Sequence, residues 1–114
     1  MNIDDIMSRS LYYDKNGKPM EMMAWVEKMR DEDYRRVGQT KIGKFVISTV
    51  WLGLDHSFGH GDPIIFETMV FPSCEDMWRY CTLAQAVAGH ALKVAEYTAL
   101  VSQNVSHLPE PKDE

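Results

Sequence analysis

KFVISTVWL (residues 44–52) and IIFETMVF (residues 64–71) carry the clearest structural information in this sequence. Both segments are rich in β-branched and aromatic residues, which favour extended strands. Residues 37–40 have the same character, and Ile42-Gly43 separates them from the first segment, so a tight hairpin is predicted there. Residues 53–63 join the two long strands and form a longer connection than a hairpin needs. The sequence therefore predicts an antiparallel sheet with a long loop at one end.

Helices are predicted on both sides of these strands. Met22, Met23, Val26 and Met29 recur at helical spacing and indicate an amphipathic helix over residues 20–34. Residues 82–85, TLAQ, form a capping-box pattern that begins a long helix over residues 83–103. Residues 11–13 are expected to form a short strand before an Asn-Gly turn, and residues 78–81 an edge strand. The predicted class is α+β: a small antiparallel sheet of about four or five strands, one N-terminal amphipathic helix and one long C-terminal helix.

Length and composition indicate a single domain. The chain has 114 residues and is 45% hydrophobic, which is sufficient for one core. We expect the domain to span residues 11–104, with flexible tails over residues 1–10 and 105–114.

Charge and composition also exclude several classes of partner. The net charge of -5 and the lack of a basic stripe argue against binding to duplex nucleic acid. Cys74 and Cys81 match no zinc or redox spacing, so neither a metal nor another cofactor is predicted. The sequence contains no apolar run long enough to span a membrane and no basic leader at its start, so a cytoplasmic location is expected.

Pairing of the two long strands predicts an oligomer. One register places Val46, Val50, Phe66 and Val70 on a shared core face. The opposite face, which would include Ile47, Trp51, Glu67 and Phe71, would then be too apolar to face water. Either the first helix or a second protomer would cover it, and a homodimer or larger assembly is expected. Small residues on the long helix form a second surface that allows close approach of another helix or a sheet: Ala84, Ala88, Gly89, Ala91 and Ala95.

Glu67 is a carboxylate in the middle of an apolar strand, so it must be paired, hydrogen-bonded or used. A hydrogen bond to Thr49 or an ion pair with an arginine at 35, 36 or 79 would make it structural. Contact with a ligand is the alternative.

The long loop gathers polar and aromatic side chains. Asp55, His56, His60 and Asp62 lie close in sequence to Trp51 and to Phe58, a combination typical of a binding site. Metal binding and general-base catalysis by His56 remain alternatives, but no familiar ligand spacing or nucleophile motif is present.

A second group of candidate residues precedes the long helix. Trp78, Arg79 and Tyr80 combine aromatic surfaces with a guanidinium group suited to phosphate, although packing of an edge strand explains them equally simply. His90, on a mostly apolar helix, is expected to be a packing residue.

Several segments resemble a known group of proteins: VISTVWLGLDH (residues 46–56), Phe58, PIIFETMVF (63–71), YYDKNGKPM (12–20), YRRV (34–37), Arg79-Tyr80 and Gly89-His90. The chain is similar to a family of short proteins of unassigned function encoded by bacteriophages, prophages and some bacteria. The likeness covers most of residues 12–92. Cys81 and the methionine-rich first helix depart from the family pattern, so the helix packing transfers least.

The family has no agreed activity. By analogy with other small acidic phage proteins that lack an enzyme motif, the resemblance implies an accessory factor that acts against host defence. One class of such factors sequesters nucleotide immune signals between protomers. The first hypothesis is therefore a non-catalytic protein that binds a small nucleotide-like ligand, such as a cyclic nucleotide or an ADP-ribose derivative, at an oligomeric interface. Its expected contacts are stacking by Trp51, Phe58 and Tyr80, phosphate binding by Arg36 and Arg79, and polar contacts from Asp55, His56 and Glu67. The alternatives are a protein-binding inhibitor of a host enzyme, and a small hydrolase or lyase that uses His56 and Glu67.

Overall fold

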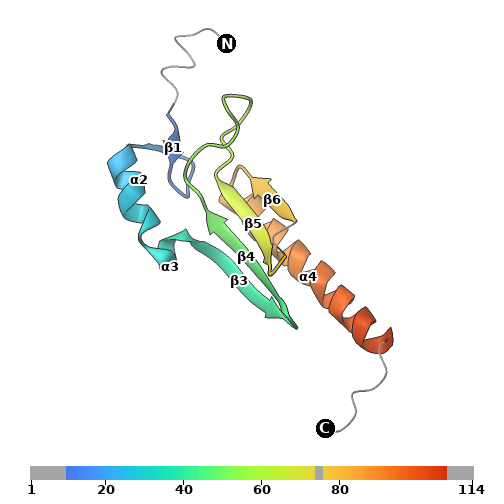
Figure 1. The fold of residues 1–114 in the computed structure, drawn as a ribbon. Coiled ribbons are helices and arrows are strands. Elements are labelled where there is room, and N and C mark those ends of the chain that lie inside the picture. Colours follow the sequence, from blue (N-terminus) through green and yellow to red (C-terminus); the bar gives the residue numbers. More distant parts are fainter. Residues whose placement is uncertain (1–9, 74–75, 108–114) are drawn as a thin grey trace.

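The fold is α+β, as predicted, and consists of a four-stranded antiparallel sheet, a small two-stranded sheet and helices at both ends of the chain (Figure 1). This computed structural model describes residues 10–73 and 76–107. The expected tails, residues 1–10 and 105–114, lie mostly outside these ranges. The elements are β1 (Tyr12–Tyr13), β2 (Pro19–Met20), α2 (Met22–Met29), α3 (Glu32–Arg35), β3 (Arg36–Ile42), β4 (Phe45–Trp51), β5 (Phe66–Phe71), β6 (Met77–Tyr80) and α4 (Leu83–His107).

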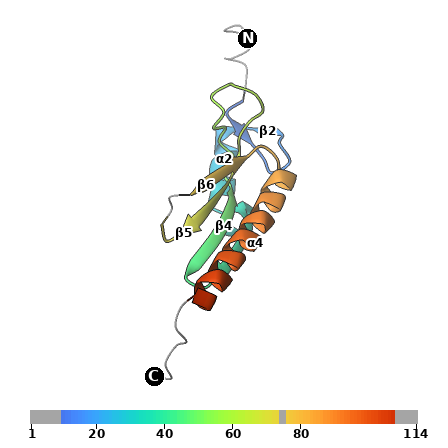
Figure 2. The ribbon, with the colours of Figure 1, turned by 90° about the vertical axis from the view of Figure 1, so that its right-hand side faces the viewer.

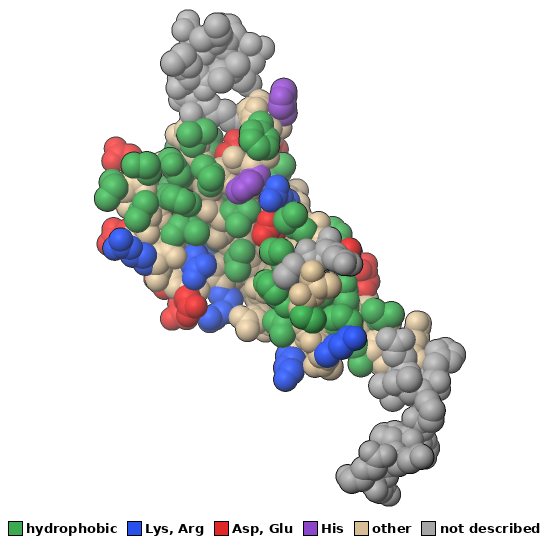
Figure 3. All heavy atoms as spheres, in the orientation of Figure 1, with side chains coloured by type: hydrophobic (Ala, Val, Ile, Leu, Met, Phe, Trp, Pro, Cys, Tyr) green, Lys and Arg blue, Asp and Glu red, His purple; other side chains and the backbone are tan. Residues whose placement is uncertain are grey.

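The main sheet is a simple meander in which β3, β4, β5 and β6 are neighbours in chain order. The expected hairpin, long loop and edge strand are all present. Figure 2 shows α4 lying along one face of this sheet. The opposite face, which we call the open face, looks towards the viewer in Figure 3. The protein therefore has two layers, and only one face of the sheet is covered by helix α4.

The pairing of β4 with β5 differs by one residue from the predicted register. Ile47 lies opposite Val70, and Trp51 lies opposite Phe66, so these four side chains face α4 and form the core side. A shift of one residue moves every side chain to the other face of a strand. Phe66 and Val70 lie in the core as predicted, but the predicted core face of β4 was wrong. An eleven-residue connection, unlike a tight turn, does not fix the register. The apolar face is covered mainly by α4, and Trp25 and Tyr34 from the region of the predicted first helix pack against it at the end of β4.

The predicted helix over residues 20–34 is divided into α2 and α3. Asp31 interrupts it, because its carboxylate accepts a hydrogen bond from the Tyr34 backbone N–H at 3.1 Å and begins α3. On α2, the Trp25 indole donates to the Leu52 carbonyl at 2.9 Å. On α3, the Tyr34 ring meets Trp51 edge-on at 4.9 Å. The break allows both aromatic side chains to reach the end of β4.

The long C-terminal helix begins as the sequence predicts. Thr82 Oγ1 accepts a hydrogen bond from the Gln85 N–H at 3.1 Å, while Gln85 Oε1 accepts from the Thr82 N–H at 3.3 Å. The helix continues to His107, beyond the expected end near residue 103.

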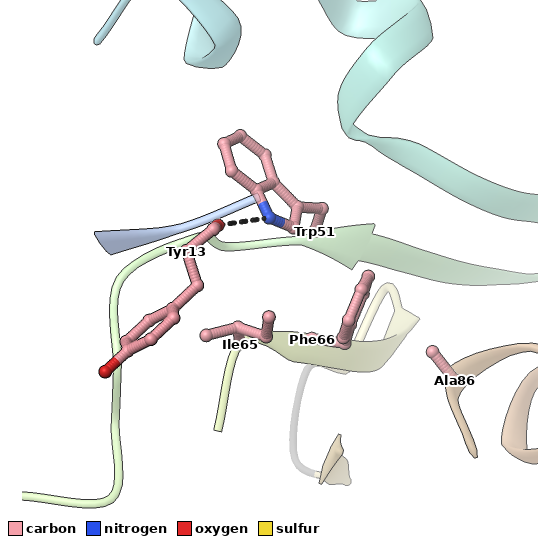
Figure 4. Close-up of a cluster of buried hydrophobic side chains, with 5 residues drawn as sticks. All are labelled: Tyr13, Trp51, Ile65, Phe66 and Ala86. Atoms are coloured by element: carbon pink, nitrogen blue, oxygen red, sulfur yellow. Dashed lines mark hydrogen bonds between the residues drawn. The ribbon is translucent and has the colours of Figure 1, made fainter. Parts of the chain in front are cut away.

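The core is centred where β4, β5 and α4 meet the first hairpin. Figure 4 shows its cluster of buried side chains: Tyr13, Trp51, Ile65, Phe66 and Ala86. Trp51 has no exposed surface, and its indole N–H donates to the Tyr13 carbonyl at 2.9 Å. The β1–β2 hairpin is thereby fixed to the end of the sheet from which the long loop emerges.

Candidate functional site

The long loop is organised by the carboxylate of Asp55. Its Oδ1 accepts hydrogen bonds from the backbone N–H groups of Ser57 at 2.7 Å and Ile64 at 3.0 Å, and its Oδ2 accepts from the Ser57 hydroxyl at 2.9 Å. These bonds connect the two ends of the loop. Asp55 therefore holds the loop in shape, whereas it was expected to make a polar contact with the ligand.

This loop and the segment that precedes the first hairpin line a cavity of about 410 Å³. The Leu11 carbonyl accepts from the Asp55 N–H at 2.8 Å, which holds the N-terminal segment against the loop. The cavity, which we call the loop cavity, is lined by Ser10, Leu11, Leu54, Asp55, His56, Phe58 and Gly59. Its walls are mainly apolar, a property typical of sites for small organic ligands.

Phe58 is the most exposed large apolar side chain in this region. Its side chain is 86% exposed, and its backbone φ of 56° lies in the left-handed region. This conformation is unfavourable for a bulky residue and is associated with functional loops. The loop thus presents an aromatic ring at the edge of the cavity.

His56 provides a polar group in the cavity wall. Its Nδ1 lies 2.7 Å from the Leu54 carbonyl oxygen. Because a carbonyl can only accept, Nδ1 carries the hydrogen, and Nε2 is left as an acceptor when the ring is neutral. His56 is half-buried. The protein holds its Nδ1–H, and Nε2 is the nitrogen that could accept a hydrogen bond from a ligand.

Three of the expected site residues lie in one row across the open face. Arg36 pairs with Val50, Val50 with Glu67, and Glu67 with Arg79. Arg79 Nε donates to Glu67 Oε2 at 3.0 Å, and Glu67 is only 9% exposed. The ion-pair interpretation of Glu67 is confirmed with Arg79 as the partner. The charges of Glu67 and Arg79 therefore neutralise each other. Arg36, the other arginine of this row, pairs with the exposed Asp33 among the described residues.

Trp51 and Tyr80 lie on the other side of the sheet. Trp51 is part of the core, and Tyr80 packs beneath α4 against Gly89, where a Cβ would collide with its ring. Neither ring is placed to stack on a ligand. The eight expected residues are therefore distributed over the loop, the open face and the core.

The sequence interpretation missed a second, smaller cavity on the open face. It has a volume of about 170 Å³ and is lined by Glu32, Arg35, Arg36, Gln39, Ser48 and Val50. We call it the α3 cavity. Gln39 on β3 and Ser48 on β4 are direct cross-strand partners, so their side chains lie on the same face of the sheet. From the sequence, Arg35 is predicted only as a possible ion-pair partner for Glu67.

His90 has the packing role expected of it. Its Nε2 lies 2.9 Å from Thr40 Oγ1 and its Nδ1 lies 2.7 Å from Thr49 Oγ1. Thr49 is in turn hydrogen-bonded to Thr68 at 2.5 Å. Burial lowers the pKa of His90, which favours the neutral ring.

Within residues 10–73 and 76–107, no group of three or more His, Cys, Asp or Glu side chains is arranged to hold a metal ion. In the same ranges, α4 and the other helices lack the combination of length and apolar character needed to cross a membrane. No protein-family model matches the chain, and neither a curated protein nor a solved structure gave a match.

Proposed function

We propose that this protein binds a small nucleotide-like ligand and does not transform it, with the ring system of the ligand in the loop cavity. The observation that carries the proposal is the apolar cavity of about 410 Å³ with Phe58 at its edge and His56 in its wall. This volume lies within the usual range for small-molecule sites.

The chemistry of the lining supports a flat, partly polar ligand. Leu11 and Leu54 offer apolar contact, and the exposed ring of Phe58 offers a stacking surface. His56 Nε2 can accept a hydrogen bond from an exocyclic amine or a ring N–H. A heteroaromatic base has both properties.

The engagement of the carboxylates favours binding over catalysis. Asp55 is occupied by the loop backbone and by Ser57, and Glu67 by Arg79. A hydrolase that uses His56 and Glu67 would need both groups at one reacting centre, yet they line no common cavity among the described residues. Sequestration of a cyclic nucleotide or an ADP-ribose-type immune signal by a phage accessory protein is the role that we infer.

The test is a thermal-shift screen against cyclic dinucleotides, cyclic trinucleotides and ADP-ribose variants, with the recovered ligand checked by mass. Ligand at ~100 times its dissociation constant should add about 2.7 kcal/mol, which raises the melting temperature by several degrees. His56→Ala should weaken binding by about tenfold, because a buried hydrogen bond is lost.

His60→Ala is the matched control. His60 lies in the same loop, is exposed and does not line the cavity, so this variant should bind as the wild type does. A shift accompanied by altered ligand would indicate an enzyme. If no member of the panel shifts the wild type, the nucleotide proposal is wrong.

An apolar surface on α2 favours the second candidate function, a protein-binding inhibitor. Met22 and Met23 are exposed, and Met23 is 69% exposed. Hydrophobic side chains gather over this helix in Figure 3. Methionine-rich surfaces adapt readily to protein partners. Co-purification of a host enzyme that is lost in Met23→Glu, together with no response to nucleotides, would favour this function over the first.

A further inference from the structure

Arg35 is a partly buried cation whose side chain has no protein partner among the described residues. Its Nε is buried and makes no hydrogen bond, and no ion pair is found for its guanidinium within residues 10–73 and 76–107. An unpaired, partly buried charge is costly, and arginines in such positions are normally matched by a carboxylate or a phosphate. In a chain of net charge -5, acidic side chains to pair with it are plentiful. The unmatched guanidinium therefore points to an external anion.

The α3 cavity places further donors around Arg35. Helix α3 packs against β3 and β4, so Arg35 and Arg36 at the junction of α3 and β3 form one wall. Gln39 and Ser48 come from the sheet and add an amide and a hydroxyl. Donors from a helix end and from two strands surround a small volume of about 170 Å³. A tetrahedral oxyanion, with oxygens in several directions, can accept from all of them.

Arg36 is available to take part. Among the described residues, its guanidinium pairs only with Asp33, at 3.4 Å, and that side chain is 94% exposed. Exposed ion pairs of this kind contribute little and are easily exchanged. Glu32 is the one lining residue of the α3 cavity that would repel an anion.

We infer that the α3 cavity is a binding site for a phosphate group, held by Arg35 and Arg36 with Gln39 and Ser48 as neutral donors. The site shares no lining residue with the loop cavity, so it does not depend on the function proposed above. The phosphate can be free or part of a larger molecule, because only its oxygens are recognised.

The test is a titration of the full chain with inorganic phosphate at low ionic strength, followed by the arginine side-chain signals in ¹H–¹⁵N spectra. The Nε–H signal of Arg35 should shift and saturate. Arg35→Gln should weaken binding by about tenfold or more, because it removes a charge-assisted pair. Glu32→Gln should strengthen binding several-fold, since it removes a like charge from the wall.

Arg30→Gln is the control for net charge. Arg30 is exposed and does not line the α3 cavity, so binding should be unchanged. Equal losses in Arg35→Gln and Arg30→Gln, or no saturable shift at Arg35 in the wild type, would overturn the assignment. The Glu32→Gln variant keeps the test decisive even if Arg35→Gln fails to fold.

Two further ligands identify the source of the phosphate. If the site binds phosphate as part of a larger molecule, adenosine monophosphate should shift the Nε–H signal of Arg35 as inorganic phosphate does. A response to inorganic phosphate alone would assign the site to the free ion. Adenosine should leave Arg35 unshifted, and a shift with adenosine would contradict phosphate recognition.

Discussion

The imidazole of His90 connects α4 to the sheet through threonine hydroxyls on β3 and β4. Gly38 on β3 makes this possible, because a Cβ there would lie 2.9 Å from His90 Nε2. The neutral ring suits the arrangement, since one nitrogen can donate and the other accept. A buried polar network that is fully satisfied is expected to define how the helix docks on the sheet.

Stability should fall on acidification because of His90. Its pKa in the folded protein is lowered from 6.5 by burial, so the unfolded chain binds the proton more readily. The contribution of the neutral ring is complete above pH 6.5 and is lost as the pH falls from there through the folded-state pKa. Urea unfolding at a series of pH values should show this loss for the wild type.

His90→Gln is the comparison variant, because glutamine keeps a donor and an acceptor but does not titrate. It should be less stable than the wild type at neutral pH. Its free energy of unfolding should also depend less on pH below 6.5. Parallel pH profiles for the two proteins would show that His90 does not carry the effect.

Among the elements, α4 is the one whose start is most clearly encoded. The reciprocal bonds between Thr82 and Gln85 satisfy N–H groups that have no partner within the helix. Gln85 Oε1 also accepts from the Cys81 N–H at 2.9 Å. The pattern is local in sequence, which is why it could be recognised without a structure.

Thr82→Ala should lower the free energy of unfolding by about 1 kcal/mol, because the hydroxyl acceptor at the helix start is lost. Thr82→Ser retains that acceptor and should stay close to the wild type. Chemical denaturation of both variants measures the difference. Equal stability of Thr82→Ala and the wild type would mean that water replaces the cap without cost.

Elements defined by local patterns were predicted, and so was the antiparallel pairing of β4 with β5, but the register of this pairing was not. The hairpin around Gly43, the edge strand and the start of α4 follow from neighbouring residues. The register of β4 with β5 depends on how the two strands pack under α4. The alternation of apolar and polar residues along each strand does not reveal it. The break at Asp31 could not be predicted because the apolar residues continue at helical spacing across it. An Asp side chain can either point to solvent within a helix or cap a new one, and the sequence does not show which it does.

At the scale of the whole molecule, the same register explains why the expected site is divided. Trp51 and Glu67 were expected to share a face, but they point to opposite sides of the sheet, one into the core and one to the open face. The loop was identified as a candidate site because its residues are close in sequence, but the contribution of Ser10 and Leu11 to the loop cavity was not predicted. The α3 cavity was not predicted, because Arg35 and Ser48 are brought together only by the fold.

Four of the five small residues of α4 face away from its own sheet, whereas Gly89 faces the sheet and packs against Tyr80. Ala84, Ala88, Ala91 and Ala95 are exposed, while Ala86 is buried against the sheet. Together with Leu92, which is 56% exposed, they form an uncharged outer stripe. An interface that meets its own copy across a two-fold axis benefits from such a lack of charge, because like charges would face each other. We therefore expect the interface of a homo-oligomer to lie on this stripe of α4, and not on the apolar face of the sheet.

Light scattering coupled to size exclusion should give twice the chain mass of 13.1 kDa for the wild type. Leu92→Glu should reduce this to the monomer, because two carboxylates would be buried close together at the axis. His60→Glu adds the same charge in the exposed loop and should stay dimeric. A monomeric wild type at tens of micromolar would contradict the prediction, and a dimer that survives Leu92→Glu would place the interface on another surface.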